Sequence, residues 1–460
     1  MNTRLPLLVR HAMYNLRGGF LVRPMGIALI LGCVGALLSW LEELQPSISN
    51  WVPAVIFPSH ADPQVAQIIL AGIAGSIMTV VSIVFAILLM TLTLASMQFS
   101  PRIIISFSRD RVTQWTLGIF LGTFLYCTAA LPAARSLPHP VAPVATVLGA
   151  ILLAIACVGW LLFFIHHISQ AISVNYIVDR IASETEAVID DTMPWPRQPA
   201  RVAVTDANLD GLAGTVVPSE ASGYIRFIDA ARLVSLAKTH HVRMRVHRRV
   251  GQFVPAGTPL VVLSKSGSLA DEAIAELRGA FDLGPSRTLQ QDVEFGVLQI
   301  VDIALKAISP AVNDPTTAIS CVDQLSRILI RFASRELPEP LLYDPPGVVR
   351  VAVPWIGHEG LLNSAFEQIR MYSKTDVAVS LRLLRALADI ALTTPDADYR
   401  RALVERGRRV VAGCAERLLD HEMKYLRARL AELEGVTRPA ALASDRSATP
   451  GAPAPTLPAP

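Results

Sequence analysis

Residues 66–97, AQIILAGIAGSIMTVVSIVFAILLMTLTLASM, form an apolar stretch without a single charged side chain. A helix rises about 1.5 Å per residue, so roughly 20 apolar residues cross the ~30 Å hydrocarbon core of a bilayer. The stretch is long enough to cross that core and to tilt or continue past its surface. It therefore predicts a membrane-spanning helix and decides the class of the protein.

Three further apolar stretches flank it, at residues 24–41, 115–134 and 141–168. They too lack Asp, Glu, Lys and Arg, whose side chains would cost several kcal/mol to bury in lipid. The pattern predicts an α-helical domain with four transmembrane helices over residues 24–168.

The remainder of the chain has the composition of a water-soluble protein. Over all 460 residues, 52% are apolar and 17% are charged, against about 25% charged in globular proteins. The deficit of charge lies in residues 24–170, whereas residues 180–435 carry an ordinary share of Arg, Asp and Glu. A net charge of +3 creates no strong field that would attract nucleic acid, so we expect no nucleic-acid partner.

The charges in the loops predict the orientation, because loops rich in Lys and Arg stay in the cytoplasm. The loop between the first two spans has neither residue. Basic residues gather in the N-terminal arm, residues 1–23, and in the loop between the second and third spans: Arg4, Arg10, Arg17, Arg23, Arg102, Arg109 and Arg111. We therefore predict that both termini lie in the cytoplasm and that Arg102, Arg109 and Arg111 contact lipid headgroups.

Hydroxyl side chains form a stripe along the second span. On a helix, one face of this span carries Ser76, Thr79, Ser82, Thr93 and Ser96. Two interpretations remain open. Ser and Thr allow neighbouring helices to approach and to form hydrogen bonds, so the stripe is explained by helix packing. Alternatively, it lines the water-filled pore of an oligomer.

Strand-like alternation begins beyond a predicted helical linker at residues 169–195. Residues 223–228, GYIRFI, and residues 242–246, VRMRV, alternate as strands do. Tight turns are expected at Gly251 and Gly257. The segment is thus predicted to form a small β-rich module that precedes the helical part of the soluble region.

The layout of residues 196–268 resembles the barrel-sandwich hybrid of lipoyl and biotinyl carriers, which implies a small β barrel-like module. A carrier of this type would need a lysine on a hairpin tip. The sequence offers Lys238 within a helix-like stretch instead, so we expect a structural or oligomerising role.

Residues 269–435 have mainly helical periodicity and are predicted to form a helical cytoplasmic domain. Within it, Asp314 is expected to be an N-cap and Pro315 the first helical residue. The fold class is therefore a membrane α-helical domain followed by an α+β cytoplasmic region. Residues 436–460 contain Ala, Pro, Ser and Thr with few large apolar residues, and we expect a disordered tail.

Polar residues of the helical domain form the candidate ligand or cation cluster: Asp292, Asp302, Asn313 and Asp314. Mg²⁺ and Ca²⁺ prefer oxygen ligands of this type, but helix caps and surface ion pairs explain the same residues. The sequence contains no P-loop, HExxH motif, dinucleotide fingerprint or nucleophile elbow, and its five cysteines form no CxxC pair. We therefore assign no catalytic residue and expect no cofactor.

Several short motifs carry a resemblance to a family: MQFSPRI at 97–103, FSRD at 107–110, GTFLY at 122–126, FIHHI at 164–168, DVEFG at 292–296 and SPAVNDPTTA at 309–318. Together they resemble the bacterial predicted membrane proteins of domain-of-unknown-function family 2254. The likeness covers almost the whole chain except the tail. It implies a location in the bacterial inner membrane and carries no catalytic residue over.

Three functions remain open at this point. The polar stripe and the large soluble region favour an oligomeric channel or transport protein with a cytoplasmic regulatory or assembly domain, whose partners would be the lipid bilayer and further copies of itself. A membrane-anchored scaffold or ligand sensor is the alternative. A metal-dependent membrane hydrolase using the acidic cluster is the third.

Overall fold

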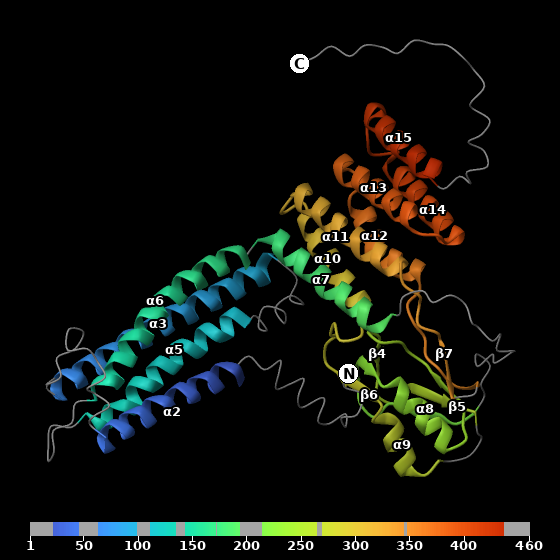
Figure 1. Ribbon diagram of the computed structural model, residues 1–460. Coiled ribbons are helices and arrows are strands. Elements are labelled where there is room, and N and C mark those ends of the chain that lie inside the picture. Colours follow the sequence, from blue (N-terminus) through green and yellow to red (C-terminus); the bar gives the residue numbers. More distant parts are fainter. Residues whose placement is uncertain are drawn as a thin grey trace, which may run out of the picture. The chain divides into compact units, whose positions relative to one another are not determined.

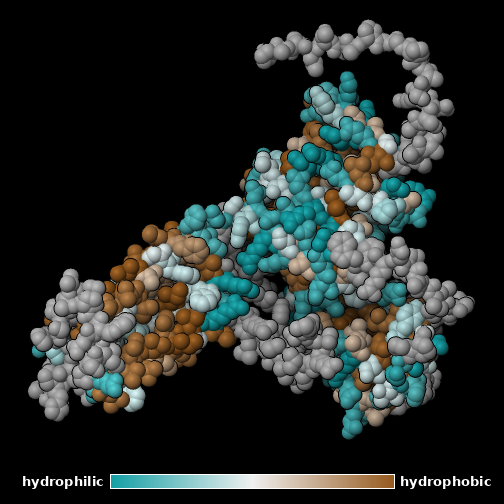
Figure 2. All heavy atoms as spheres, in the orientation of Figure 1, coloured by the Kyte–Doolittle hydropathy of each residue, from teal (hydrophilic) through white to brown (hydrophobic). Residues whose placement is uncertain are grey.

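The structure is a computed structural model that describes residues 22–45, 63–98, 111–134, 143–171, 173–193, 214–264, 269–344 and 347–436. It divides into two compact units, residues 1–177 and residues 178–460. We call the first the bundle unit and the second the α/β unit. Figure 2 shows hydrophobic residues over much of the bundle surface and predominantly hydrophilic residues over the α/β unit.

The bundle unit consists of α2 (Val22–Leu44), α3 (Pro63–Gln98), α5 (Arg111–Ala130) with the 3₁₀ turn η3 (Leu131–Ala133), and α6 (Val144–Ala171). The four helices lie side by side, and α5 contacts each of the other three (Figure 1). Three of them are long and apolar enough to cross a membrane, over Val22–Leu44, Pro63–Thr93 and Val144–Gln170. The sequence prediction of membrane-spanning helices is thus confirmed for three stretches.

The remaining stretch, α5, is a helix that is less apolar than the other three. Its buried residues include Thr113, Gln114, Thr116 and Thr123, which face the neighbouring helices rather than the outside of the bundle. The Trp160 indole Nε1 donates to the Thr116 hydroxyl at 2.9 Å, and the Thr123 hydroxyl lies 3.3 Å from the Cys157 sulfur. These contacts join α5 to α6 in the interior of the unit.

The α/β unit contains two open sheets. Its strands are β1 (Val216–Pro218), β2 (Gly223–Ile228), β3 (Met244–Val246), β4 (Phe253–Val254), β5 (Pro259–Leu263), β6 (Phe281–Gly284), β7 (Leu341–Asp344) and β8 (Val348–Ala352). Five form a sheet in the order β1-β5-β3-β8-β7, and three form a sheet in the order β4-β2-β6. The pairing is antiparallel except between β3 and β8, which run parallel.

A closed barrel is absent from the described strands, so the predicted barrel-like module over residues 196–268 is not confirmed. Its described strands separate into the two sheets, and β6, β7 and β8 from beyond residue 268 complete them. Such long-range partners leave no mark in local alternation, which is why the sequence did not indicate them. Lys238 lies in α8 (Ala230–Thr239) rather than on a hairpin tip, and it pairs with Asp344 at 2.9 Å.

The core of this β-rich part is formed by the inner faces of both sheets. It includes Ile225 and Ile228 from β2, Met244 and Val246 from β3, and Val351 from β8, all nearly inaccessible to solvent. Helices α8 and α9 (Asp271–Arg278) add Leu233 and Leu277 to the same core. Positive φ angles at Gly251 and Gly257, 86° and 81°, agree with the predicted turns.

The remaining helices are α7 (Val174–Thr192), α10 (Val293–Ala307), α11 (Pro315–Ala333), α12 (His358–Tyr372), α13 (Val377–Thr393), α14 (Ala397–Cys414) and α15 (Asp420–Val436). Helix α7 begins three residues after α6 ends, and the division between the units falls within it. Helices α10 to α15 form a helical layer in which consecutive helices pack on one another (Figure 1).

Candidate functional site

The hydroxyl stripe of α3 points away from the other helices of the bundle unit. Ser76, Thr79, Ser82 and Thr93 are all exposed in the single chain, and the side chain of Ser96 lies outside the described residues. The hydroxyls of Thr79, Ser82 and Thr93 donate to the carbonyl oxygens one turn earlier, at 3.1, 3.0 and 2.8 Å. Their polarity is therefore satisfied within α3 itself.

A buried carboxylate joins the end of α2 to the beginning of α6. Glu42 is only 2% exposed, and its carboxylate accepts hydrogen bonds from the backbone amides of Ala145 and Thr146 at 2.7 and 2.9 Å and from the Thr146 hydroxyl at 2.5 Å. The amides at a helix N-terminus have no partner within the helix, and the helix dipole favours a negative charge there. Glu42 thus caps α6 from a different helix.

Glycines allow α2 and α5 to pack closely. Gly118 and Gly122 of α5 face Ile27 and Leu31 of α2, and a Cβ atom at Gly122 would lie 3.1 Å from the Leu31 Cβ and closer still to its Cδ1. On α2, a Cβ atom at Gly35 would lie 2.6 Å from the Tyr126 carbonyl oxygen. This is the small-residue packing that joins helices in lipid, where burial from water supplies no driving force.

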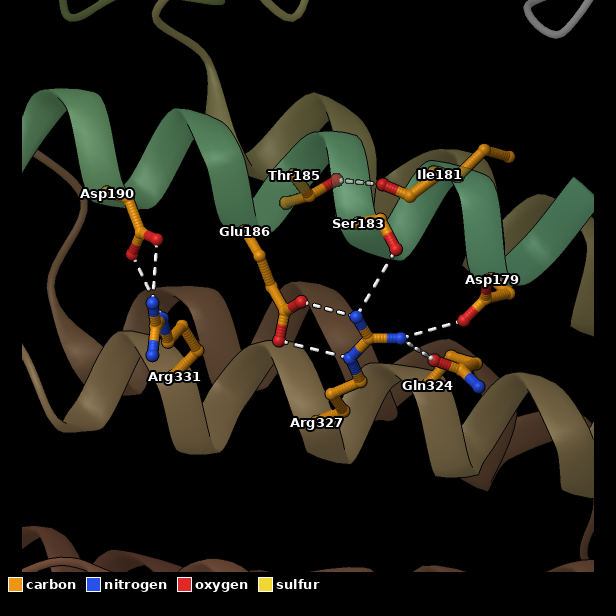
Figure 3. A network of polar contacts seen from close by, with 9 residues as sticks. All are labelled: Asp179, Ile181, Ser183, Thr185, Glu186, Asp190, Gln324, Arg327 and Arg331. Carbon is orange, nitrogen blue, oxygen red and sulfur yellow. Dashed lines mark hydrogen bonds and ion pairs between the residues drawn. The ribbon is translucent and has the colours of Figure 1, made fainter.

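In the α/β unit, α7 is held against α11 by a network of ion pairs that Figure 3 shows. Arg327 makes two parallel bonds to Glu186, at 3.1 and 2.6 Å, and also reaches Asp179 at 2.8 Å. One turn further along each helix, Arg331 pairs with Asp190 at 2.9 and 2.6 Å, and Arg335 contacts the same carboxylate. The guanidinium groups, Arg331 first, hold the pKa of Asp190 below its usual value.

An adjacent side of α7 meets α10 at a glycine. A Cβ atom at Gly296 would collide with the hydroxyl of Thr185, a fully buried residue of α7 whose hydroxyl donates to the Ile181 carbonyl at 2.6 Å. Val178, Ala182 and Ile189 complete the buried face of α7. Helix α7 is therefore fixed on two sides within the α/β unit, by ion pairs and by close packing.

A second ionic network, largely buried, connects the strands to α10. Asp292 accepts from Arg287 at 2.7 and 2.8 Å and from the Phe295 amide at 3.1 Å, which makes it the N-cap of α10. Glu294 pairs with Arg249 and Arg287, both at 2.9 Å, and accepts from the Ser364 hydroxyl at 2.8 Å. Burial alone would raise the pKa of Glu294, but these donors outweigh it and keep the pKa below its usual value.

The structure does not bring the predicted acidic cluster together. Asp292 caps the start of α10, whereas Asp314 follows its end and caps α11 by accepting from the Thr317 amide at 3.1 Å. The 15 residues of α10 separate the two caps by about 22 Å. Asp302 is half-buried along α10, and Asn313 is exposed with a φ of 50°. Among the described residues, no group of three His, Cys, Asp or Glu side chains could hold a metal ion.

Of the predicted headgroup contacts, Arg111 is the exposed first residue of α5, while Arg102 and Arg109 lie outside the described residues. The N-terminal arm to residue 21 and the tail from residue 437 lie outside them as well.

A half-buried histidine, His358, occupies the junction of α11, α12 and α14. The His358 ring lies 5.3 Å from the Phe332 ring and 5.1 Å from the Tyr399 ring. Its Nε2 atom and the Tyr399 hydroxyl are buried and have no hydrogen-bond partner among the described residues. Removal from water lowers the pKa of His358, although Asp396 and a bond to the Phe332 backbone act in the opposite direction.

Sequence reasoning missed the roles of Glu42 and Gly296. Because Glu42 is charged, the sequence analysis assigned it to the loop after the first span. No sequence pattern indicates its contact with Thr146, about a hundred residues later. The motif DVEFG was noticed as part of the family resemblance, and its Asp292 was assigned to the candidate cation cluster. The structure explains its three polar or small positions, since Asp292 caps α10, Glu294 joins the buried ion pairs and Gly296 admits α7.

Comparison with known proteins confirms the family that the sequence motifs resemble. Residues 17–389 match the profile of the predicted membrane proteins of domain-of-unknown-function family 2254. The uncharacterized proteins Mb1321c of Mycobacterium bovis and Rv1290c of Mycobacterium tuberculosis are each 30% identical over 438 residues, which cover 93% of this chain and 82% of the relative. No solved structure matches the chain. The chain therefore belongs to family 2254 of predicted membrane proteins.

Proposed function

We propose that the protein is a homo-oligomeric channel or transport protein of the bacterial inner membrane, with both termini and the α/β unit in the cytoplasm. The basic N-terminal arm and the loop without Lys or Arg after the first span support this orientation. The α/β unit then has a regulatory or assembly role.

We include α5 as a fourth span. Its 20 residues give a length of about 30 Å, which matches the hydrocarbon core. It packs against three helices that are themselves apolar enough to cross, and its polar side chains face them rather than lipid. An even number of spans also places the basic N-terminal arm and the α/β unit on the same side of the membrane.

The observation that carries the proposal is the exposed face of α3. Besides the hydroxyl residues it carries Gly72 and Gly75, and no heavy atom lies within 4 Å of a Cβ atom built at either glycine. A face of small residues lets another helix approach closely, and no other helix of the described bundle occupies it. A second copy of α3, repeated around a symmetry axis, would fit this face and bring Ser76 and Thr79 toward the centre of a pore.

Reconstitution of the purified protein in lipid tests whether it conducts ions and whether the exposed face of α3 joins copies of the chain into an oligomer. Ser82→Leu and Thr93→Leu are expected to change the conductance, and Gly75→Leu to weaken the oligomer measured by native mass spectrometry. Gly159→Leu is the matched control, because Gly159 is an exposed glycine of α6 that also has open space around it. Intact oligomers that never conduct, under any ionic condition, would reject the channel.

A ligand sensor is the second candidate, and the arrangement around α7 favours it. Because α7 packs on α10 and α11 and follows α6 in the chain, a shape change in the α/β unit would be passed along the chain to the last span through α7. Cross-linking α7 to α11 through Ser183→Cys and Gln324→Cys would suppress the response of such a sensor and leave an ungated pore unaffected.

A further inference from the structure

The face of the five-stranded sheet opposite its core cluster carries basic side chains along β3, beside Val262 of β5, which is 7% exposed on that face. Along β3 and its flanks, Val242, Met244 and Val246 are nearly inaccessible and face the core, while the alternate residues Arg243, Arg245 and His247 point to the other side. Arg243 and His247 are exposed and Arg245 is half-buried. Three basic side chains therefore follow one another along the outer side of a single strand.

The neighbouring strand β8 adds a fourth basic side chain, that of Arg350. In β8, Val349 and Val351 face the core and Arg350 lies between them on the outer side. Strands β3 and β8 run parallel with Met244 beside Val351 and Arg245 beside Ala352, so the same register brings Arg350 beside Arg243. We call Arg243, Arg245, His247 and Arg350 the arginine face.

Two arginines of the arginine face, Arg243 and Arg245, have no counter-charge among the described residues. Most described arginines of this unit pair with a carboxylate, as Arg226 does with Asp282 at 2.7 Å. The side chains of Arg243 and Arg245 make no ion pair or hydrogen bond with the described residues, and Arg245 Nε is buried without a partner. Arg350 has Asp344 only at 3.5 Å, and that carboxylate is shared with Lys238. Arginine side chains without a paired carboxylate can bind an anion from outside the chain.

We propose that the arginine face binds the phosphate groups of anionic lipids in the cytoplasmic leaflet. This inference rests on the orientation given under Proposed function, which places the α/β unit in the cytoplasm. Arg243 and Arg245 lie about 6.6 Å apart along β3 and Arg350 lies beside Arg243 on β8, so the arginine charges are spread along the sheet rather than gathered around one phosphate. A charged lipid surface matches that distribution.

Attachment to the membrane makes weak contacts of this kind effective. The α/β unit follows the last span directly in the chain, because the division between the units falls within α7. A tether of this kind raises the local concentration of headgroups, into the millimolar range for short linkers. The anionic leaflet attracts each nearby arginine by about 1 kcal/mol, which changes the constant for association with the membrane about fivefold per charge.

A contact assay on the full-length protein tests the proposal. A fluorophore is attached at Val216→Cys in a Cys33→Ser background, because Val216 lies on the outer side of β1, opposite Val262 in the same sheet. The protein is placed in nanodiscs of phosphatidylcholine alone or mixed with phosphatidylglycerol, with a nitroxide quencher on a fraction of the headgroups. We expect stronger quenching in the anionic discs and its loss at high salt.

Three variants separate charge from folding. Arg243→Gln/Arg245→Gln should reduce the constant for association with anionic discs, obtained from the quenching, by roughly 25-fold, from about fivefold per charge. Arg243→Lys/Arg245→Lys should retain it. Arg417→Gln/Arg427→Gln, which removes two exposed arginines elsewhere in the unit, should leave it unchanged.

Quenching that is equal in neutral and anionic discs overturns the proposal, and so does loss of quenching in the lysine variant. Inorganic triphosphate is added to neutral discs as a separate arm. Tight binding of triphosphate that depends on Arg243 and Arg245, without any lipid dependence, would assign the face to a soluble phosphate ligand instead. The assay requires no ion flux and exposes both leaflets, so a failure of the channel proposal leaves its result interpretable.

Discussion

The two units use the same device to bring helices together but differ in what they add to it. In the bundle unit, Gly118 and Gly122 let α5 approach α2, and in the α/β unit Gly296 lets α10 approach α7. The bundle unit adds hydroxyl bonds and one buried carboxylate, Glu42, whereas α7 is also held by a row of arginine–carboxylate pairs. The difference teaches that close approach sets the packing in both environments, while ion pairs set the register only where water can solvate their outer side.

A substitution at Gly122 is the most direct test of whether close helix packing holds the bundle unit together. A valine there would meet Leu31, whose Cβ and Cγ atoms lie 3.1 and 3.2 Å from the position of the new Cβ atom. Overpacking of this kind costs about 1–3 kcal/mol, and more where the backbone cannot move. We expect Gly122→Val to lower the melting temperature in detergent, measured by fluorescence-detected size exclusion, more than any other single change discussed here.

Gly159→Val provides the control, since no heavy atom lies within 4 Å of a Cβ atom at Gly159. If both variants melt like the wild type, close packing of α2 and α5 does not hold the bundle unit together.

The next largest effect is expected at Glu42. Replacement by alanine leaves the amides of Ala145 and Thr146 and the Thr146 hydroxyl without their acceptor in a buried position, at a cost of about 1–3 kcal/mol. Glu42→Gln keeps one acceptor oxygen but loses the charge that the helix dipole favours, so it should lie between alanine and the wild type. The measurement is the unfolding of the full chain in mild detergent.

Glu43 supplies a neighbouring control, because it is exposed at the same end of α2. A Glu43→Ala variant that destabilises as much as Glu42→Ala would show that general charge at this end, and not the cap on α6, is responsible.

The ion pairs on α7 should contribute less, because they are partly solvated. The Arg327 side chain is 40% exposed and that of Glu186 is 21% exposed, which favours a coupling of about 0.5–1 kcal/mol for this two-bond contact. A double-mutant cycle with Arg327→Gln and Glu186→Gln isolates the coupling from other effects of each substitution.

The pair Arg409–Glu405 is the matched control, with side chains 53% and 54% exposed and a distance of 3.3 Å. Its coupling should be no more than a few tenths of a kcal/mol, as for exposed pairs one turn apart. Equal coupling energies in the two cycles would remove the special role of the α7–α11 contact.

Much of the bundle unit could be predicted from the sequence, because a span is a local property. Length and the absence of charge located the stretches that became α2, α3 and α6 without any knowledge of their neighbours. The N-cap Asp314 and the first helical residue Pro315 were predicted for the same reason, since an N-cap and its first turn lie within four residues.

What could not be predicted depends on distant residues. The parallel pairing of β3 with β8 joins segments about a hundred residues apart, so the strands in residues 196–268 gave the impression of a separate barrel. The acidic cluster was inferred from nearness in the sequence, but α10 keeps Asp292 and Asp314 at its two ends. The same limitation hid the Glu42 cap, whose partners lie on another span.

The smallest expected effect is a pH dependence of stability, and it concerns the α/β unit alone. The folded chain lowers the pKa of His358 because burial disfavours the imidazolium. Between the folded and unfolded pKa values the unfolded chain binds more protons, so the free energy of unfolding falls as the pH drops through that interval and levels off below it. Carboxylates with lowered pKa values, such as Asp190, Glu294 and Glu367, lose their contribution to the free energy of unfolding only at lower pH, in and below the usual carboxyl range.

The melting temperature of the wild type should therefore decrease by a few degrees at most from pH 7.5 to pH 5. The variant His358→Phe, which places an apolar ring between Phe332 and Tyr399, should remove that decrease. A pH profile that is the same in both proteins would mean that the half-buried imidazole contributes nothing to the acid sensitivity of the α/β unit.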